Sequence, residues 1–183
     1  MRRPVSLVMA VTLCLWSAAF ATPGPKSGAF VDAPVGTLAT RRIGHLHLSG
    51  DPSSTDVAAM KSAGFRAVID IRQPSEANRA SLEAAANAAG IAYHNVPLFD
   101  AAGAIDAKAV AAISALHEKN EGVPHLVSCK SGNRSSAWYA AHIAKSQGLD
   151  SDKAIALGRQ AYLRDDMAAA VKSYLTKPVK PGP

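Results

Sequence analysis

The sequence of 183 residues predicts an α/β fold in which helices flank a central, mostly parallel sheet of about four to five strands. Strand-like and helix-like segments alternate along the chain, as they do where helices connect parallel strands. Glycine follows most of the helix-like segments, which marks where they end. A third observation is a strand that leads into a tight, polar turn and then a helix within residues 125–147. This arrangement predicts a binding site at the carboxyl end of a strand.

The first half of the domain contains three strand-like segments. Residues 43–48 alternate between apolar and polar side chains, and residues 67–71 form an apolar run typical of a buried strand. Residues 91–96 form the third strand, and a loop follows at residues 97–104. The helices of this half, each followed by a glycine stop, are expected at residues 54–63 and about 75–89.

The second half contains the strand that feeds the polar turn, at residues 125–128. Its helices carry apolar residues at helical spacing, for example Ala109, Ile113 and Leu116 on one face of the first. These helices are expected at residues 106–120, 134–147, 152–163 and 165–175.

The N-terminus predicts export from the cytoplasm. Arg2 and Arg3 precede a short apolar stretch, and small residues near position 21 offer a cleavage point, which together indicate a secretory signal peptide at residues 1–21. The stretch is short for a bilayer-spanning helix, so we expect no stable membrane insertion after cleavage and a secreted or periplasmic protein. The expected organisation beyond the signal is a linker at 22–39, a catalytic domain at 40–176 and a flexible tail at 177–183.

The charge of the chain is modest. The formal net charge is +6, and without Arg2 and Arg3 it is +4, from 18 basic and 14 acidic residues. Such an excess attracts anionic substrates weakly. No basic stripe with interleaved aromatic residues is present, so nucleic-acid binding is not expected.

Cys129 is the residue most indicative of chemistry, because it is the only cysteine outside the expected signal peptide. A lone cysteine has no intramolecular disulfide partner. The polar and flexible residues that follow it, Lys130, Ser131, Gly132 and Asn133, argue against a purely apolar core position. Backbone N–H groups of the turn and the positive end of the following helix favour a thiolate and a bound anion. Arg134 adds a planar, two-pronged donor to this predicted anion site.

Four stretches resemble a known family: residues 48–53 (Leu-Ser-Gly-Asp-Pro-Ser), 63–65 (Ala-Gly-Phe), 67–72 (Ala-Val-Ile-Asp-Ile-Arg) and 128–135 (Ser-Cys-Lys-Ser-Gly-Asn-Arg-Ser). They are similar to the bacterial phosphatase-like domain that is related to dual-specificity protein phosphatases and also occurs in beta-lactamase hydrolase-like proteins. The resemblance spans about residues 42–163 and implies the three-layer architecture of cysteine phosphatases.

The resemblance implies a cysteine-dependent hydrolase that acts on a phosphorylated protein or small molecule without a cofactor or metal. Cys129 would attack phosphorus, while Arg134 and the amides of residues 130–133 hold the phosphoryl oxygens. Ser135 would hydrogen-bond the sulfur as it departs. A phosphatase also needs a general acid, for which Asp100 and Asp106 are the candidates. Asp106 has the pattern of a helix N-cap, whereas Asp100 lies in the loop proper.

Two features keep other functions open. Ser128 stands where protein tyrosine phosphatases have a histidine, and four residues rather than five separate Cys129 from Arg134. The shorter loop resembles that of rhodanese-type sulfurtransferases, which hold a persulfide on the cysteine, although the Gly-His-Ile-Pro-Gly-Ala stretch common in rhodaneses is absent. An anion-binding module without turnover is a third interpretation.

Overall fold

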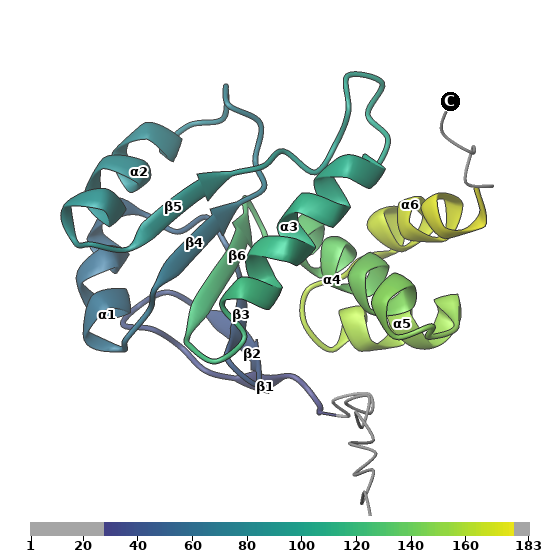
Figure 1. Ribbon diagram of the computed structural model, residues 1–183, viewed down its shortest axis with the longest axis horizontal. Helices are drawn as coiled ribbons and strands as arrows, with labels where there is room; N and C mark the ends of the chain where they lie inside the picture. Colours follow the sequence, from purple (N-terminus) through teal and green to yellow (C-terminus); the bar gives the residue numbers. More distant parts are fainter. Residues whose placement is uncertain (1–27, 178–183) are drawn as a thin grey trace, which may run out of the picture.

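The structure is a computed structural model that describes residues 28–177, so the expected signal peptide lies outside the described residues. A six-stranded sheet with the order β1-β2-β3-β6-β4-β5 forms its centre (Figure 1). The strands β3, β6, β4 and β5 are parallel, and β1 and β2 join the β3 edge in antiparallel pairing. The strands are β1 (Val31–Asp32), β2 (Thr40–Ile43), β3 (Leu46–Gly50), β4 (Ala67–Asp70), β5 (Ala92–Asn95) and β6 (His125–Cys129).

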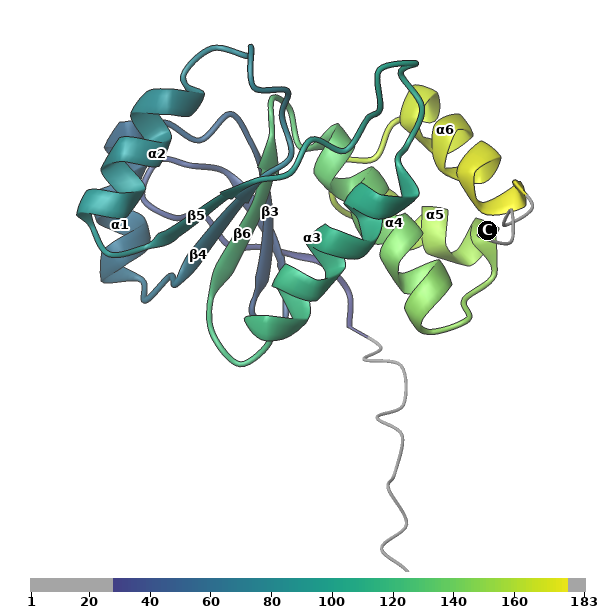
Figure 2. The same ribbon diagram turned by 45° about the horizontal axis from the view of Figure 1, so that its top comes forward.

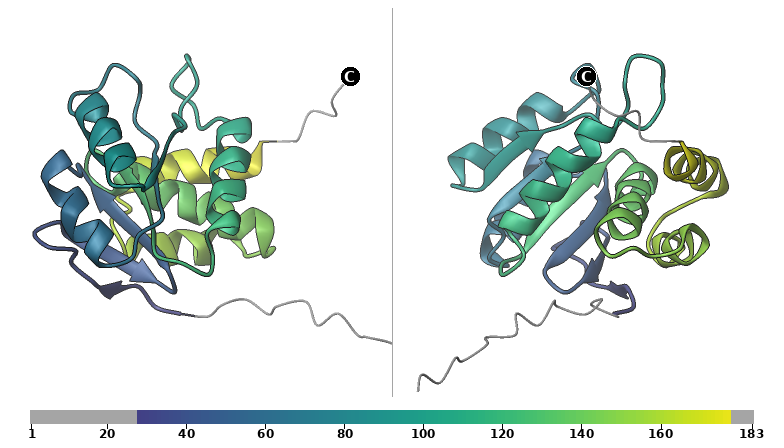
Figure 3. Two further views of the ribbon diagram at one scale, coloured as in Figure 1. Left: turned by 60° about the vertical axis from the view of Figure 1, so that its left-hand side comes forward. Right: turned by 45° about the vertical axis from the view of Figure 1, so that its right-hand side comes forward.

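Helices cover both faces of the sheet. Their bounds are η1 (Ser54–Asp56), α1 (Val57–Ser62), α2 (Arg79–Ala88), α3 (Ala107–Lys119), α4 (Asn133–Ser146), α5 (Ser151–Arg159) and α6 (Asp165–Thr176). Figure 2 shows α1 and α2 on one face and α3 and α4 on the other. The helices α5 and α6 pack on α4 and on each other, outside the three layers (Figure 3). The predicted α/β fold class is therefore confirmed, with two short antiparallel strands added at one edge.

The core is divided by the sheet into two apolar clusters. Val57 and Met60 of α1 and Leu82 of α2 pack on one face. The larger cluster lies on the other face, where Ile113 of α3 and Trp138 of α4 are both fully buried. Because the central strands are covered on both sides, their side chains form apolar runs rather than an alternating pattern.

The N-terminal edge of the sheet differs from the sequence prediction. Residues 28–39 were expected to belong to a linker, yet β1 pairs with β2, and Phe30 and Leu38 are buried. The single strand expected at residues 43–48 is instead a hairpin of β2 and β3, because Gly44 takes a positive φ of 57° and reverses the chain. Because this segment is rich in small residues and proline, its sequence did not indicate the strands there, which are stabilised by pairing with an existing sheet edge.

The start of α2 also differs from the prediction. The helix was expected from about residue 75 but begins at Arg79, after Asn78 with a φ of 64°. The preceding residues form turns in which Gln73 N donates a hydrogen bond to Glu76 Oε1. Four residues therefore form a loop at the carboxyl end of the sheet. No helix within residues 28–177 is long and apolar enough to cross a membrane.

Candidate active site

Cys129 ends the central strand β6 and directly precedes the turn to α4. In the sheet, Cys129 is paired with Gly50 of β3. The preceding residue, Ser128, is paired with Asp70 of β4. Asp51 N donates a 2.6 Å hydrogen bond to Cys129 O, and Ile71 N donates one to Ser128 O. Backbone pairing on both sides thus fixes the position of the sulfur at the carboxyl end of the parallel sheet, where α/β proteins place their ligand sites.

The turn after Cys129 directs a backbone donor at the sulfur. Gly132 N donates to Cys129 Sγ at 3.1 Å, and Gly132 takes a φ of 81°, a conformation that L side chains rarely adopt. The helix α4 begins at the next residue, Asn133, so the positive end of its dipole lies at the same turn. The side chain of Cys129 is fully buried. The turn thus places a backbone donor and the start of a helix at Cys129, while its role as an anion-binding loop stays a prediction.

Arg134 forms a bidentate ion pair with Glu76 from the loop between β4 and α2. Its Nη1 and Nη2 atoms donate to the two carboxylate oxygens at 2.6 and 2.7 Å. The hydrogen bonds to Glu76 raise the pKa of Arg134 despite its partial burial, and the adjacent Cys129 contributes to the same shift. Reciprocally, the hydrogen bond from Arg134 lowers the pKa of Glu76.

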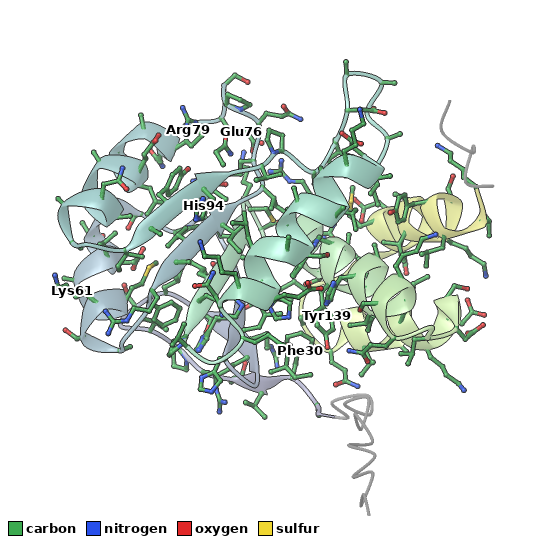
Figure 4. The ribbon with its side chains drawn as sticks, viewed as in Figure 1. Phe30, Lys61, Glu76, Arg79, His94 and Tyr139 are labelled. Carbon is green, nitrogen blue, oxygen red and sulfur yellow. The ribbon has the colours of Figure 1, made fainter. Side chains whose placement is uncertain are left out.

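This pairing leaves part of the guanidinium available. Glu76 uses one N–H of Nη1 and one of Nη2, which leaves Nε–H and one further N–H on each Nη atom, and the guanidinium also hydrogen-bonds the Cys129 side chain. A guanidinium binds a phosphoryl group through two parallel N–H bonds of this kind. Glu76 lies in the loop above the carboxyl end of the sheet (Figure 4). The loop between β4 and α2 therefore fixes the arginine while leaving it able to bind an anion.

A second arginine, Arg72, anchors the floor of the same region. It is 1% exposed and donates from Nε and Nη2 to the fully buried Asp70 at 2.7–3.0 Å. Burial opposes its charged form, but the hydrogen bonds to Asp70 raise the pKa of Arg72. Its Nη1 donates to Asp51 Oδ1 at 3.2 Å. The ion pair between Asp70 and Arg72 extends to Asp51, the residue directly after β3.

The segment between α5 and α6 supports the loop from the opposite side. Asn133 Oδ1 accepts a hydrogen bond from Arg164 N, and Asn133 Nδ2 donates to Asp166. The guanidinium of Arg164 donates to Ser131 Oγ at 3.1 Å. A Cβ at Gly132 would lie 2.4 Å from the ring of Tyr162, so the ring closes directly over this residue. These contacts hold the loop in place from outside the sheet.

The remaining predicted site residues take different positions. Lys130, the residue after Cys129, is exposed. Ser135 is buried and donates to Gly132 O at 2.8 Å, so its predicted hydrogen bond to the sulfur stays a prediction. Asp100 Oδ1 accepts hydrogen bonds from Ala102 N and Ala104 N at 2.9 Å each, which makes it the organising residue of an exposed turn. Asp106 caps α3 by accepting from Lys108 N, as its sequence pattern predicted.

Sequence reasoning missed Glu76 and Asp51 as parts of the site. Glu76 fell within the expected helix at residues 75–89, where an acidic residue near the start has a sufficient explanation in the helix dipole. Pro74 and the turn-forming residues after Arg72 were the available signal that a loop precedes the helix. Asp51 precedes Pro52 after a strand, which indicates a turn but not its direction.

Residues 28–177 contain no group of three or more His, Cys, Asp or Glu side chains that could hold a metal ion. The groups that the structure brings together at this site are the Cys129 thiol, the backbone amide of Gly132 and the Arg134 guanidinium. Together they can bind a tetrahedral oxyanion and present a sulfur nucleophile to it.

Comparison with known proteins gives one family and a set of similar structures. The family model described as the phosphatase-like domain of beta-lactamase hydrolase-like proteins matches residues 42–148. No curated protein matches this chain. TpbA of P. aeruginosa superposes with a TM-score of 0.61 at 23% identity, covering 81% of this chain and 92% of TpbA.

Two further solved structures have the same fold. A putative phosphatase (DUF442) from Shewanella putrefaciens CN-32 has a TM-score of 0.59 at 20% identity, with 76% of this chain and 93% of that chain covered. PTPMT1 in complex with PI(5)P has a TM-score of 0.60 at 17% identity, with 72% and 90% covered. At these identities the likeness establishes the fold, and the match to the family model establishes the family.

Proposed function

Because the chain belongs to the family of phosphatase-like domains of beta-lactamase hydrolase-like proteins, we propose that it is an exported, cysteine-dependent phosphatase of phosphate monoesters. The observation that carries the proposal is the loop itself. Gly132 N–H contacts Cys129 Sγ at 3.1 Å, and the guanidinium of Arg134, which Glu76 holds, also hydrogen-bonds the Cys129 side chain. The export part of the proposal rests on the signal-like residues 1–21.

The proposed reaction has two steps. In the first, the Cys129 thiolate forms a bond to phosphorus as the bond from phosphorus to the ester oxygen breaks, and the leaving oxygen takes up a proton. In the second, water attacks phosphorus, the S–P bond breaks, and inorganic phosphate leaves with the thiolate restored. Arg134 and the loop amides stabilise the equatorial oxygens in both transition states, where the charge on them is greatest.

The proton for the leaving oxygen is assigned in this proposal to Asp100. Its Oδ1 is occupied by two backbone amides, so Oδ2 is the atom that would carry the proton. We expect Asp100→Asn to slow the hydrolysis of esters with poor leaving groups and to affect a good leaving group much less, because the latter needs little protonation.

Parallel assays on the purified protein test the proposal. We expect hydrolysis of p-nitrophenyl phosphate by the wild type, no hydrolysis by Cys129→Ser, and a loss of about 100-fold or more in kcat/KM for Arg134→Ala, as for other single oxyanion donors. Arg159→Ala is the matched control, since Arg159 also pairs with one carboxylate, that of Asp165, but is half exposed on α5. Its activity should equal that of the wild type.

The same protein is assayed with thiosulfate and cyanide because the spacing of four residues between Cys129 and Arg134 resembles that of sulfurtransferases. Thiocyanate formation without phosphate release would replace the phosphatase proposal with a persulfide mechanism. An absence of both activities, together with tight binding of phosphate by the wild type, would support an anion-binding module instead.

A further inference from the structure

A polar cavity of about 270 Å³ lies beside the loop of residues 129–134, called the nucleophile loop below. Lys130, the residue after Cys129, forms part of its wall, and so does Glu76, which holds Arg134. The other walls are contributed by Asp51, Arg72, Ala77 and Asn78. A group attached to a phosphate in the loop therefore has this cavity as a neighbour. Its volume is slightly below the roughly 300 Å³ at which pockets for drug-sized ligands begin, so it suits a small group.

The polar side chains of the walls favour a hydroxylated leaving group over an aromatic one. Four of the six lining residues are charged, one carries an amide, and Ala77 provides the only apolar side chain. An aryl ring placed here would remove water from charged and polar groups and return no hydrogen bonds, which is unfavourable. A group with several hydroxyls would replace the water it displaces.

Two of the charged groups remain available to such a ligand. Arg72 is held by Asp70, and both carboxylate oxygens of Glu76 are bound by Arg134. By contrast, Asp51 has a side chain that is 52% exposed and receives one hydrogen bond, from Arg72 at Oδ1. Within the described part of the chain, the exposed Lys130 has no hydrogen bond or ion pair. The cavity thus offers a carboxylate acceptor and an ammonium donor.

The backbone of Asp51 fixes its carboxylate relative to the nucleophile. Asp51 is one of two residues other than glycine with a positive φ among residues 28–177, and its value is 38°. Its N–H donates to Cys129 O at 2.6 Å, and Gly50 before it pairs with Cys129 in the sheet. Non-glycine residues in this region of φ are uncommon and occur preferentially at functional sites. The backbone of Asp51 is consequently fixed next to that of Cys129 by the same hydrogen bond that ends the strand, and its carboxylate is held by Arg72 in the wall of the cavity.

We propose that this cavity binds the leaving group of hydroxylated alkyl phosphates, that is, sugar or polyol monophosphates. Asp51 accepts hydrogen bonds from substrate hydroxyls, Lys130 donates to them, and Asp51 is the residue that determines the preference over aryl esters. This inference rests on the proposed phosphatase function and specifies its substrate class.

The first test measures kcat/KM for glucose 6-phosphate and for p-nitrophenyl phosphate in the full chain and in Asp51→Asn. Asparagine adopts positive φ about as readily as aspartate, so the variant should keep the backbone conformation. We expect the ratio of the two kcat/KM values, sugar ester over aryl ester, to fall at least fivefold. The control is Asp152→Asn, because Asp152 is likewise exposed and bound by a single cation, Lys172 at 3.1 Å, but lies on α5. Its ratio should equal that of the wild type.

The second test measures binding without turnover. In Cys129→Ser, calorimetric titration should give an affinity for glucose 6-phosphate at least tenfold higher than for phenyl phosphate. Should Asp51→Asn fail to fold, Lys130→Gln takes its place, since Lys130 is exposed and its loss should lower the same ratio.

The outcomes separate the two proposals. Hydrolysis of the aryl ester with an unchanged ratio in Asp51→Asn, or binding of phenyl phosphate as tight as that of the sugar ester, would overturn the substrate class and leave the phosphatase function intact. If neither ester is hydrolysed by the wild type, the phosphatase function fails and the substrate class fails with it.

Discussion

Replacement of Gly50 by alanine would test whether contact with β3 sets the position of the nucleophile loop. A Cβ added at Gly50 would lie 2.6 Å from Ser131 Cα and 3.0 Å from Gly132 N. Because carbon atoms in contact are about 3.5 Å apart or more, the loop would have to move by about 1 Å. Both contacted atoms belong to backbone, so no side-chain rotation can relieve the clash.

The expected effect on activity is larger than the effect on stability. Overpacking costs about 1–3 kcal/mol, while alanine in place of glycine in a strand recovers roughly 0.5–1 kcal/mol. The net loss in the free energy of unfolding is therefore about 2.5 kcal/mol at most. A displacement of about 1 Å at a reacting centre can reduce the rate about 100-fold. We expect a folded Gly50→Ala protein whose kcat/KM on p-nitrophenyl phosphate is lower by about that factor.

The assay combines urea unfolding with steady-state kinetics. Gly122→Ala serves as the control, because a Cβ there meets no atom within 4 Å and the backbone is not in the left-handed region. We expect wild-type activity for this control, with stability unchanged or higher by up to about 1 kcal/mol. A wild-type kcat/KM in Gly50→Ala would show that the position of the loop does not depend on its contact with β3, and the reasoning would be wrong.

Two further perturbations test the ion pair of Arg134 with Glu76 and the buried His47. Glu76→Gln leaves a hydrogen-bond partner for Arg134 but removes the negative charge that fixes the guanidinium. We therefore expect kcat/KM to fall about tenfold while the protein stays folded. Activity equal to that of the wild type would show that Glu76 does not position Arg134. Burial lowers the pKa of His47 from 6.5 to about 4, so its neutral form stabilises the fold above pH 6.5 and this contribution is lost as the pH falls towards 4. The loss amounts to about 3 kcal/mol. Urea unfolding should therefore show that the wild type loses about 3 kcal/mol more of its free energy of unfolding between pH 7 and pH 4 than His47→Gln does. If the two proteins lose the same amount over this range, the prediction is wrong.

The order and type of the main elements could be read from the sequence because their signals are local. Periodicity and glycine stops predicted β4, β6, α3 and α4 to within a residue or two at most ends. The errors fall where a short segment depends on its surroundings. Residues 28–39 have a loop-like composition, but the open edge of β2 supplied the hydrogen bonds that make β1 a strand. At the start of α2, a pattern suited to a helix was overridden by the turn that Glu76 and Gln73 form.

The candidate site also has a part that the sequence predicted and a part that only the tertiary structure showed. Cys129, the amides after it and Arg134 lie within six consecutive residues, so the sequence by itself determined their proximity and predicted their roles as nucleophile and oxyanion clamp. Only the tertiary structure decided which groups surround them. Glu76 is 58 positions from Arg134, and Asp51 is joined to Cys129 through the pairing of β3 with β6. Such contacts arise from parallel strands that end at one edge of the sheet, and no short-range pattern records which distant residues meet there.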